Sequence, residues 1–148
     1  MVITTRAATK ADTDFARRIH HHAYREVVER QFGVWNEDRQ NEFFEASWSL
    51  GKSSCRILAC DGISCGYVMI DHLDDCIHLR ELVVAPDFQH RGIGTHVLQE
   101  TMNLARARGV AVRLGALNEN RVLRLYSRLG FKESARTETH TLMEWYYS

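Results

Sequence analysis

The stretch that decides the fold runs from residue 81 to residue 95 and reads Glu81-Leu-Val-Val-Ala-Pro86-Asp-Phe-Gln89-His-Arg-Gly92-Ile-Gly94-Thr95. Its beginning is a short apolar run typical of a buried strand, and Pro86 ends that strand because proline lacks the N–H that a sheet ladder needs. Two glycines then open a segment with helical periodicity. The stretch therefore predicts a strand, a loop rich in hydrogen-bond donors and a helix.

Gly92 and Gly94 allow the backbone to turn tightly and to leave its N–H groups exposed. Exposed N–H groups and the positive end of the following helix together form a seat for phosphate oxygens, and Arg91 adds a charged donor. We therefore expect an anion at this loop, and a pyrophosphate has the size to meet several adjacent N–H groups.

Three kinds of loop compete with this interpretation. A pair of glycines alone also suits an ordinary tight turn between a strand and a helix. A dinucleotide-binding fingerprint needs a third glycine at the position that Val97 occupies, and it needs a different preceding fold. A Walker loop is excluded because no Gly-Lys-Ser or Gly-Lys-Thr follows.

Upstream of this stretch, residues 2–7 predict a strand, and Thr9 and Asp12 have the spacing of a capping box before a helix. Asn36 is the expected N-cap of a second helix, which Gly51 ends. Three strands follow, and their short connections predict an antiparallel meander over residues 55–60, 65–73 and 76–85.

Downstream, the period predicts a helix over residues 94–109, a strand over 110–117 and a short helix over 120–129 with an inner face of Val122, Leu125 and Leu129. Gly130 and Phe131 fit a Schellman ending, and one or two strands complete the chain. A strand–helix–strand crossover requires parallel strands. We therefore expect an α/β fold of α+β type, with a mixed sheet, in a single domain over residues 1–148.

Composition narrows the function. Lys and Arg number 19 and Asp and Glu also number 19, so no net charge attracts a polyanion, and we expect no nucleic-acid partner. No apolar run is long enough for a bilayer, and the charged N-terminal residues are unlike a signal peptide, so we expect a cytoplasmic protein without a membrane partner. The four cysteines show no C-x-x-C spacing, and the consecutive His20, His21 and His22 point in different directions on a helix. We therefore expect no metal site and treat the three histidines as surface or packing residues.

The fuller pattern V-x-P-x-x-Q-x-x-G-x-G, from Val84 to Gly94, resembles the acyl-CoA signature of the GNAT superfamily of N-acetyltransferases. Residues 118–131 resemble the second motif of that family, which ends in L-Y-x-x-x-G-F. The resemblance implies a mixed, mostly antiparallel sheet flanked by about four helices. It also implies an enzyme that transfers an acetyl group from acetyl-CoA to an amine.

The resemblance further implies positions for the co-substrate. The pyrophosphate would bind the loop formed by Gln89, His90, Arg91, Gly92, Ile93, Gly94 and Thr95. Backbone groups of Leu82, Val83 and Val84 would meet the pantetheine arm and the thioester carbonyl. Asn118 or Asn120 would contact coenzyme A, and Tyr126 would lie near its sulfur.

The reaction itself requires a base, because an ammonium group with a pKa near ~10 is no nucleophile. Glu81 and His78 are the two candidates, and Tyr126 is the expected proton donor to the leaving thiolate. Direct transfer in a ternary complex is expected, since no cysteine occupies a motif position. A non-catalytic acyl-CoA sensor of the same fold is the alternative function.

The acceptor is expected to be a primary amine of a small molecule, an amino acid or a peptide. In proteins of this family the first two helices and the late strands form the acceptor pocket, and in this chain they contain Tyr24, Glu29, Trp35 and Trp145. An acidic residue among aromatic rings suits a cationic amine. A homodimer is common among the proteins that this chain resembles.

Overall fold

The computed structural model describes residues 1–147, apart from the side chain of Lys52. Within these residues seven strands form one sheet in the order β1-β2-β3-β4-β5-β7-β6. The strands are β1 (Ile3–Ala7), β2 (Cys55–Cys60), β3 (Ile63–His72), β4 (Cys76–Val84), β5 (Ala111–Leu117), β6 (Lys132–Arg136) and β7 (His140–Trp145). The α-helices are α1 (Thr13–Phe32), α2 (Glu37–Gly51), α3 (Ile93–Arg108) and α4 (Val122–Arg128).

The sheet is mixed and mostly antiparallel. Strand β4 runs parallel to β5, with Cys76 opposite Ala111 and His78 opposite Arg113. The pairs β1–β2, β2–β3, β5–β7 and β6–β7 are antiparallel. The fold class expected from the sequence is therefore confirmed, including the parallel crossover through α3.

The chain divides into two compact units. The first contains Met1–Met69 and Glu81–Ile93, and the second contains Ile70–Arg80 and the chain from Gly94 onward. Strands β3 and β4 each contribute to both units, and α3 begins at the boundary between them.

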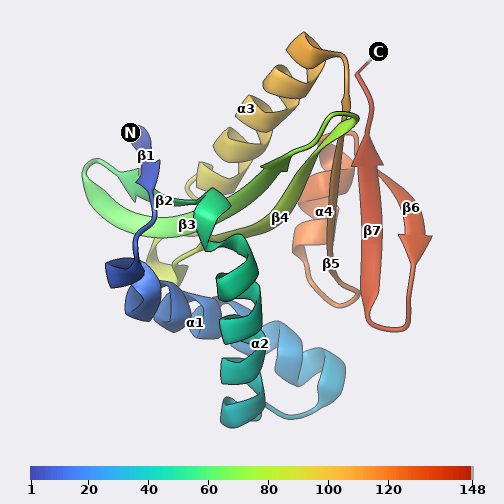
Figure 1. Cartoon of the computed structure of the whole chain (residues 1–148). Helices are drawn as coiled ribbons and strands as arrows, with labels where there is room; N and C mark the ends of the chain where they lie inside the picture. The colour runs from blue at the N-terminus through green and yellow to red at the C-terminus, as the bar shows by residue number, and fades with distance from the viewer. Residues whose placement is uncertain (148) are drawn as a thin grey trace. The chain divides into compact units, whose positions relative to one another are not determined.

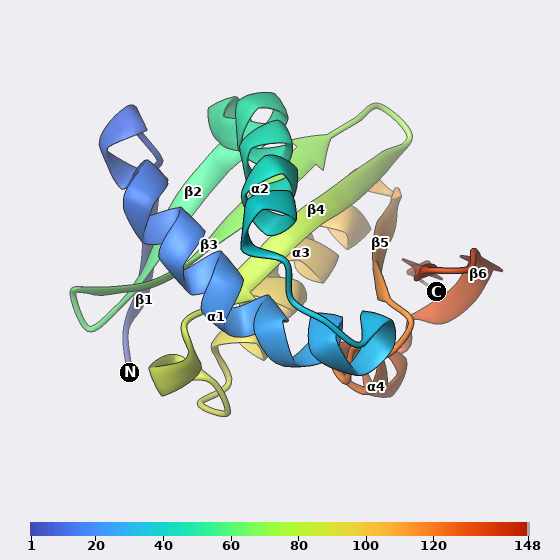
Figure 2. The same ribbon diagram turned by 90° about the horizontal axis from the view of Figure 1, so that it is seen from below.

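In the first unit, α1 and α2 cover one face of β2 and β3, as Figures 1 and 2 show from two directions. The core of this unit joins the two helices to three strands through Ala16, Ile19, Phe44, Trp48, Cys55, Ile57, Tyr67, Met69 and Val83. Local signals set the helix ends. Gly33 ends α1 with φ 84° and donates its N–H to the Glu29 carbonyl, and the Asn36 side chain accepts the Arg39 N–H at 3.0 Å.

The second unit contains most of α3, α4 and the antiparallel strands β5, β7 and β6, drawn in gold, orange and red in Figure 1. Helix α4 ends in the expected Schellman motif, since the Gly130 N–H bonds the Ser127 carbonyl and the Phe131 N–H bonds the Tyr126 carbonyl. The buried residue of α4 is Tyr126. The three residues expected on its inner face, Val122, Leu125 and Leu129, are half-buried.

Two further features concern the chain as a whole. All four cysteines are buried and free. None of the helices in the described chain combines the length and the apolar character that crossing a membrane requires.

Candidate active site

The loop between β4 and α3 offers backbone donors. A short 3₁₀ turn, Pro86–Phe88, starts it, and the N–H groups of Phe88 and Gln89 are bonded to the carbonyls of Ala85 and Pro86. The next three N–H groups, of His90, Arg91 and Gly92, donate no hydrogen bond within residues 1–147. The first N–H groups of α3 follow directly, and the first turn of a helix has no internal acceptor for them.

The conformation of this loop requires glycine at one position. Gly92 has φ 82°, and His90 also lies in the left-handed region with φ 63°. No atom lies within 4 Å of where a Cβ would stand on Gly92 or Gly94. The backbone at both glycines is therefore open to a ligand.

Gln89, the first residue of the predicted pyrophosphate loop, forms two hydrogen bonds within the protein. Its N–H is already bonded to the Pro86 carbonyl at 3.2 Å, and its side-chain amide donates to the Val84 carbonyl at 3.0 Å. Gln89 therefore fixes the loop to the end of β4. Within the predicted loop, the row of N–H groups without an acceptor in the described chain begins at His90.

At the end of β4, Val84 presents its backbone away from β3. The Val83 carbonyl lies against Gly66 of β3, where an added Cβ would come within 2.3 Å of it, and the Ala85 N–H donates to the Cys65 carbonyl of β3 at 2.7 Å. Successive backbone groups of a strand point to opposite edges. The Val84 N–H therefore faces the other edge of β4, where its carbonyl receives the Gln89 side chain.

Glu81 lies on β4 with its carboxylate held by two hydroxyl groups. The Tyr67 hydroxyl donates to Oε1 at 2.6 Å, and the Ser47 hydroxyl donates to Oε2 at 3.1 Å. Only 11% of the Glu81 side chain is exposed, and Nε2 of His20 lies 3.9 Å from Oε1. Burial and the neighbouring Glu81 raise the pKa of Tyr67 well above its usual range, so Tyr67 remains a donor.

Arg80 and His78 lie on β4 shortly before Glu81 and belong to the second unit. Arg80, which could have neutralised Glu81, has its Nε 3.5 Å from Oδ2 of Asp71. His78, the second candidate for the base, is half-buried and has a lowered pKa because of burial.

Tyr126 also belongs to the second unit. Only 5% of it is exposed, and burial raises its pKa to about 12. Its hydroxyl forms no hydrogen bond within the described chain, and no buried polar side-chain atom of that chain lacks a partner. The hydroxyl oxygen of Tyr126 therefore keeps contact with solvent while its ring is enclosed.

The two asparagines of the second motif differ in whether their side-chain NH₂ group is already hydrogen-bonded within the protein. The Asn118 amide donates to the carbonyls of Thr137 and Glu138, and its oxygen accepts from Thr141 at 2.7 Å. Asn120 accepts the Val122 N–H at 3.0 Å through its oxygen, whereas its NH₂ group has no partner among the described residues. Asn120 is therefore the one with a donor to offer a ligand.

The residues expected around the acceptor lie in both units. In the first unit, Glu29 is exposed and paired with Arg25 at 3.0 Å, and the Trp35 indole N–H donates to Glu37 at 2.6 Å. The Tyr24 ring is 4.7 Å from the His20 ring. Trp145 lies in the second unit, is 8% exposed, and is covered by the Arg106 guanidinium.

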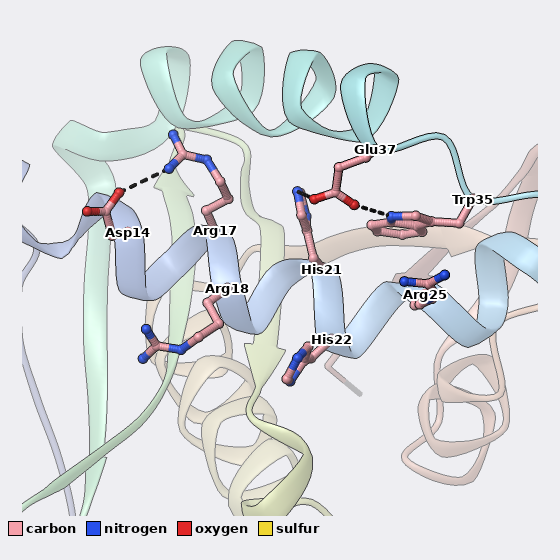
Figure 3. A pocket seen from close by; sticks show the side chains of 8 residues that line it. All are labelled: Asp14, Arg17, Arg18, His21, His22, Arg25, Trp35 and Glu37. Carbon is pink, nitrogen blue, oxygen red and sulfur yellow. Dashed lines mark hydrogen bonds and ion pairs between the residues drawn. The ribbon is translucent and has the colours of Figure 1, made fainter.

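A groove of about 350 Å³ runs along α1 beside the start of α2. Figure 3 shows its side chains: Arg17 and His21 point toward α2, whereas Arg18 and His22 point the opposite way. It is lined by Asp14, Arg17, Arg18, His21, His22, Arg25, Trp35 and Glu37. No group of three or more potential ligands in the described residues is arranged to hold a metal ion.

A sequence model of a protein family matches most of this chain. The model of the Acetyltransferase (GNAT) family matches residues 19–131, which include both the loop before α3 and the second motif. The chain belongs to the GNAT family.

This GNAT chain is also similar to individual proteins. An uncharacterized N-acetyltransferase of Methanocaldococcus jannaschii is 29% identical, in a match that covers 88% of this chain and 61% of the relative. The chain thus spans less than two thirds of that protein's length.

Among solved structures, the PaiA N-acetyltransferase of Thermoplasma acidophilum in complex with coenzyme A has a TM-score of 0.77 at 20% identity, with 99% of this chain and 100% of that chain covered. The ribosomal-protein-S18-alanine N-acetyltransferase of Escherichia coli has a TM-score of 0.67 at 20% identity, with 99% and 95% covered. At these identities the structural likeness concerns the GNAT fold.

The partners of Glu81 in this GNAT chain could not be anticipated from the sequence. Ser47 and Tyr67 carry no motif, and nothing in the sequence places them beside a residue of β4. His20 and His21 are conspicuous as part of a histidine triplet, but the sequence predicts only surface or packing roles for them. Finding the buried donors near β4 requires the packing of α1 and α2.

Proposed function

We propose that this chain binds acetyl-CoA and transfers its acetyl group to a primary amine, which attacks directly within a ternary complex. The observation that carries the proposal is the row of N–H groups at His90, Arg91 and Gly92, which have no acceptor within the described chain and precede the start of α3. Such N–H groups bind phosphate oxygens. The family match and the coenzyme A complex of the Thermoplasma neighbour support the same co-substrate.

The two units would act as one N-acetyltransferase domain over residues 1–148. The family model supports this because residues 19–131 take in parts of both units. Acetyl-CoA would supply an electrophilic thioester carbonyl and a thiolate leaving group. The residues of this chain would supply the proton transfers and the hydrogen bonds.

Glu81 would be the base. Its carboxylate would take a proton from the acceptor ammonium, directly or through one water, so that the amine becomes a nucleophile. The hydroxyl groups of Tyr67 and Ser47 hold both carboxylate oxygens in place. His78 remains the alternative base, and the lowered pKa from burial would keep it neutral and able to accept a proton.

Two groups would respond to the charge that develops during transfer. The Val84 N–H, which faces away from β3, would donate to the thioester oxygen as negative charge accumulates there. The Tyr126 hydroxyl would donate to the thiolate as it leaves. Asn120, through its NH₂ group, would contact the coenzyme.

The acceptor would be an amine of a small molecule or a peptide, held near the end of α1. Tyr24 and Trp35 offer aromatic surface there. Glu29 would attract an ammonium less strongly than a free carboxylate, because Arg25 is paired with it. If Arg25 released Glu29 when the acceptor binds, the Glu29 carboxylate would attract the ammonium fully.

Calorimetric titration of acetyl-CoA tests the loop assignment directly. We expect Gly92→Val to weaken binding by about 10-fold to 100-fold, because hydrogen bonds to a charged phosphate contribute about 1.5–3 kcal/mol. Gly62→Val is the matched control: Gly62 has φ 83° and equally open surroundings, but it lies in the turn between β2 and β3. Equal affinity of the two folded variants would contradict the loop assignment.

A second measurement separates the enzyme from a sensor. Release of free thiol from acetyl-CoA would be followed with a panel of primary amines that includes an amino acid, a polyamine and a peptide with a free N-terminal alanine. We expect amine-dependent thiol release with at least one of them. Tight binding of acetyl-CoA without thiol release for any amine would favour the non-catalytic sensor.

A further inference from the structure

Two adjacent histidines of α1 connect Glu81 to α2. Nε2 of His20 lies 3.9 Å from Oε1 of Glu81, and Nδ1 of His20 lies 3.0 Å from Nδ1 of His21. On the far side, Nε2 of His21 lies 2.7 Å from Oδ1 of Asn41 on α2. Neighbouring helical side chains usually diverge. Here the two rings meet edge to face, with centroids 5.2 Å apart, so the contact is a specific feature of this site.

These contacts determine which nitrogen carries the proton in each ring. Oδ1 of Asn41 can only accept, so Nε2 of His21 must donate to it. When that is the only proton of the His21 ring, its Nδ1 is an acceptor, and Nδ1 of His20 donates to it. Nε2 of a neutral His20 therefore has no proton, and its lone pair faces Glu81.

The surroundings keep His20 neutral at pH 7. Burial and the neighbouring His21 lower the pKa of His20 to about 4. Its ring packs 4.7 Å from the Tyr24 ring and 5.4 Å from the Phe44 ring, measured between centroids.

The other titratable groups around the pair come from four elements. Tyr24 and His21 face it from α1, Tyr67 from β3, and Cys55 from β2, while Glu37 of α2 lies 3.9 Å from Nε2 of His21. Burial raises the pKa of Cys55 to about 12 and that of Tyr67 well above its usual range, so both stay neutral. A carboxylate oxygen and an imidazole lone pair therefore face each other. Their separation of 3.9 Å is longer than a hydrogen bond, so no hydrogen bond joins them in this structure.

We propose that His20 is a positioning residue for the base: held in one tautomer by His21 and Asn41, it accepts a hydrogen bond from the proton that Glu81 removes from the acceptor amine. The inference rests on the proposed function. The ammonium N–H bond breaks as an O–H bond forms at Glu81, and this O–H then donates to Nε2 of His20. The proton returns to solvent after the acetylated amine leaves, which restores the carboxylate.

The physical effect is on the basicity of Glu81. Tyr67 and Ser47 donate to the carboxylate and therefore favour its charged form, which lowers its affinity for a proton. An acceptor that receives a hydrogen bond only from the protonated form has the opposite effect. His20 thus offsets the two donors and makes Glu81 a stronger base than it would be with the donors alone.

Nitrogen NMR of the histidine rings tests the tautomers on the unmodified protein and does not depend on activity. At pH 7 we expect neutral His20 with its proton on Nδ1, facing an Nδ1 of His21 that carries no proton. A His20 ring with its proton on Nε2 would overturn the inference, because its lone pair would then face His21.

The pH dependence of kcat/KM for thiol release tests the effect on the base. For His20→Phe, we expect the acidic limb to move down by about one pH unit and kcat to fall about 10-fold, with the KM for acetyl-CoA unchanged. Asn41→Leu, which leaves His21 free to change tautomer, should move the limb in the same direction by less. His22→Phe changes the exposed third histidine of the triplet and is the control, with no shift expected.

The outcomes distinguish the two proposals. If the wild-type protein releases no thiol with any amine, the proposed function fails, whatever the NMR result. If it releases thiol but the acidic limb of His20→Phe coincides with that of the wild type, the role of His20 is refuted while the acetyltransferase stands.

Discussion

The loop before α3 and the cluster around Glu81 flank the same end of β4, but they are built in different ways. The loop uses backbone groups of consecutive residues, and its glycines have open space around them. The cluster uses side chains from α1, α2, β3 and β4, and only 11% of the Glu81 side chain is exposed. Substitutions in the loop should therefore change ligand binding more than the chemical step, whereas substitutions in the cluster should change the chemical step and the stability of the fold.

Glu81→Gln is expected to have the largest effect of all. Glutamine keeps the shape of the side chain and can still accept from Tyr67, but it cannot take a proton. We expect kcat for thiol release to fall by about 10²-fold to 10⁴-fold, the usual contribution of a general base. Affinity for acetyl-CoA, measured by calorimetry, should remain within a few-fold of the wild type.

Glu42→Gln is the control for this substitution, since Glu42 is exposed on α2. Retention of full activity by Glu81→Gln would remove Glu81 as the base and leave His78 as the candidate. Loss of acetyl-CoA binding would mean instead that the cluster and the loop are not separable.

The same contrast explains what the sequence could predict. The helix ends, the β2–β3 turn and the loop depend on glycines, caps and one proline that act within a few residues, so residues 55–60 were expected as a strand and are β2. The partners of Glu81 lie 14 and 34 residues away along the chain. Residues so far apart in the sequence come together only when α1 and α2 pack on the sheet, and no short motif predicts that packing.

The stability of the fold should depend on pH through His20. Its pKa is about 4 in the folded protein and 6.5 in its ordinary state, so between these values the unfolded chain binds more protons. The stabilisation is complete above pH 6.5 and is lost as the pH falls toward 4. The difference between these two pKa values corresponds to about 3 kcal/mol in the free energy of unfolding.

Urea unfolding of the wild type and of His20→Phe at pH 7 and pH 4 measures this effect. We expect the wild type to lose more of its free energy of unfolding than the variant over this interval. Asp12, whose pKa is lowered to about 2 by its bond with Arg6, titrates below most of this pH interval. His78 contributes equally to the pH dependence of both proteins. Parallel losses in the two proteins would contradict the buried, neutral state of His20.

Gly66 and Gly94 differ in how much space their surroundings leave for an added side chain. A Cβ on Gly66 would stand 2.3 Å from the Val83 carbonyl oxygen, whereas nothing lies within 4 Å of one on Gly94. We expect Gly66→Ala to lower the free energy of unfolding by about 1–3 kcal/mol through overpacking of backbone against backbone. Gly94→Ala should raise it by up to about 1 kcal/mol, because alanine suits a helix better than glycine.

Acetyl-CoA titration completes this comparison. Gly94→Ala should bind the co-substrate more weakly than the wild type although it is more stable, since its methyl group occupies the space open to phosphate. An unchanged or tighter affinity would mean that Gly94 serves the helix start alone.

The sequence also left two choices open in the second motif, and side-chain bonding favours one of them. Asn118 uses all its amide groups on Thr137, Glu138 and Thr141, so it holds the β6–β7 connection. Asn120 keeps a free NH₂ group within the described chain. The spacing of the motif alone could not separate the two, because hydrogen-bond partners on β7 are distant in the chain.

Tyr126→Phe should have the smallest effect. With a pKa of about 12, the Tyr126 phenol is a weaker acid than a thiol of pKa ~8.5, so full proton transfer to the thiolate is uphill. A hydrogen bond from the hydroxyl to the thiolate is the contribution that remains, and its loss should lower kcat by about 10-fold or less. Stability should hardly change, because the hydroxyl has no partner within the described chain. Steady-state thiol release, with acetyl-CoA affinity as the control, measures this. A decrease of about 1000-fold would mean that Tyr126 transfers the proton outright, and that binding of the substrates lowers its pKa.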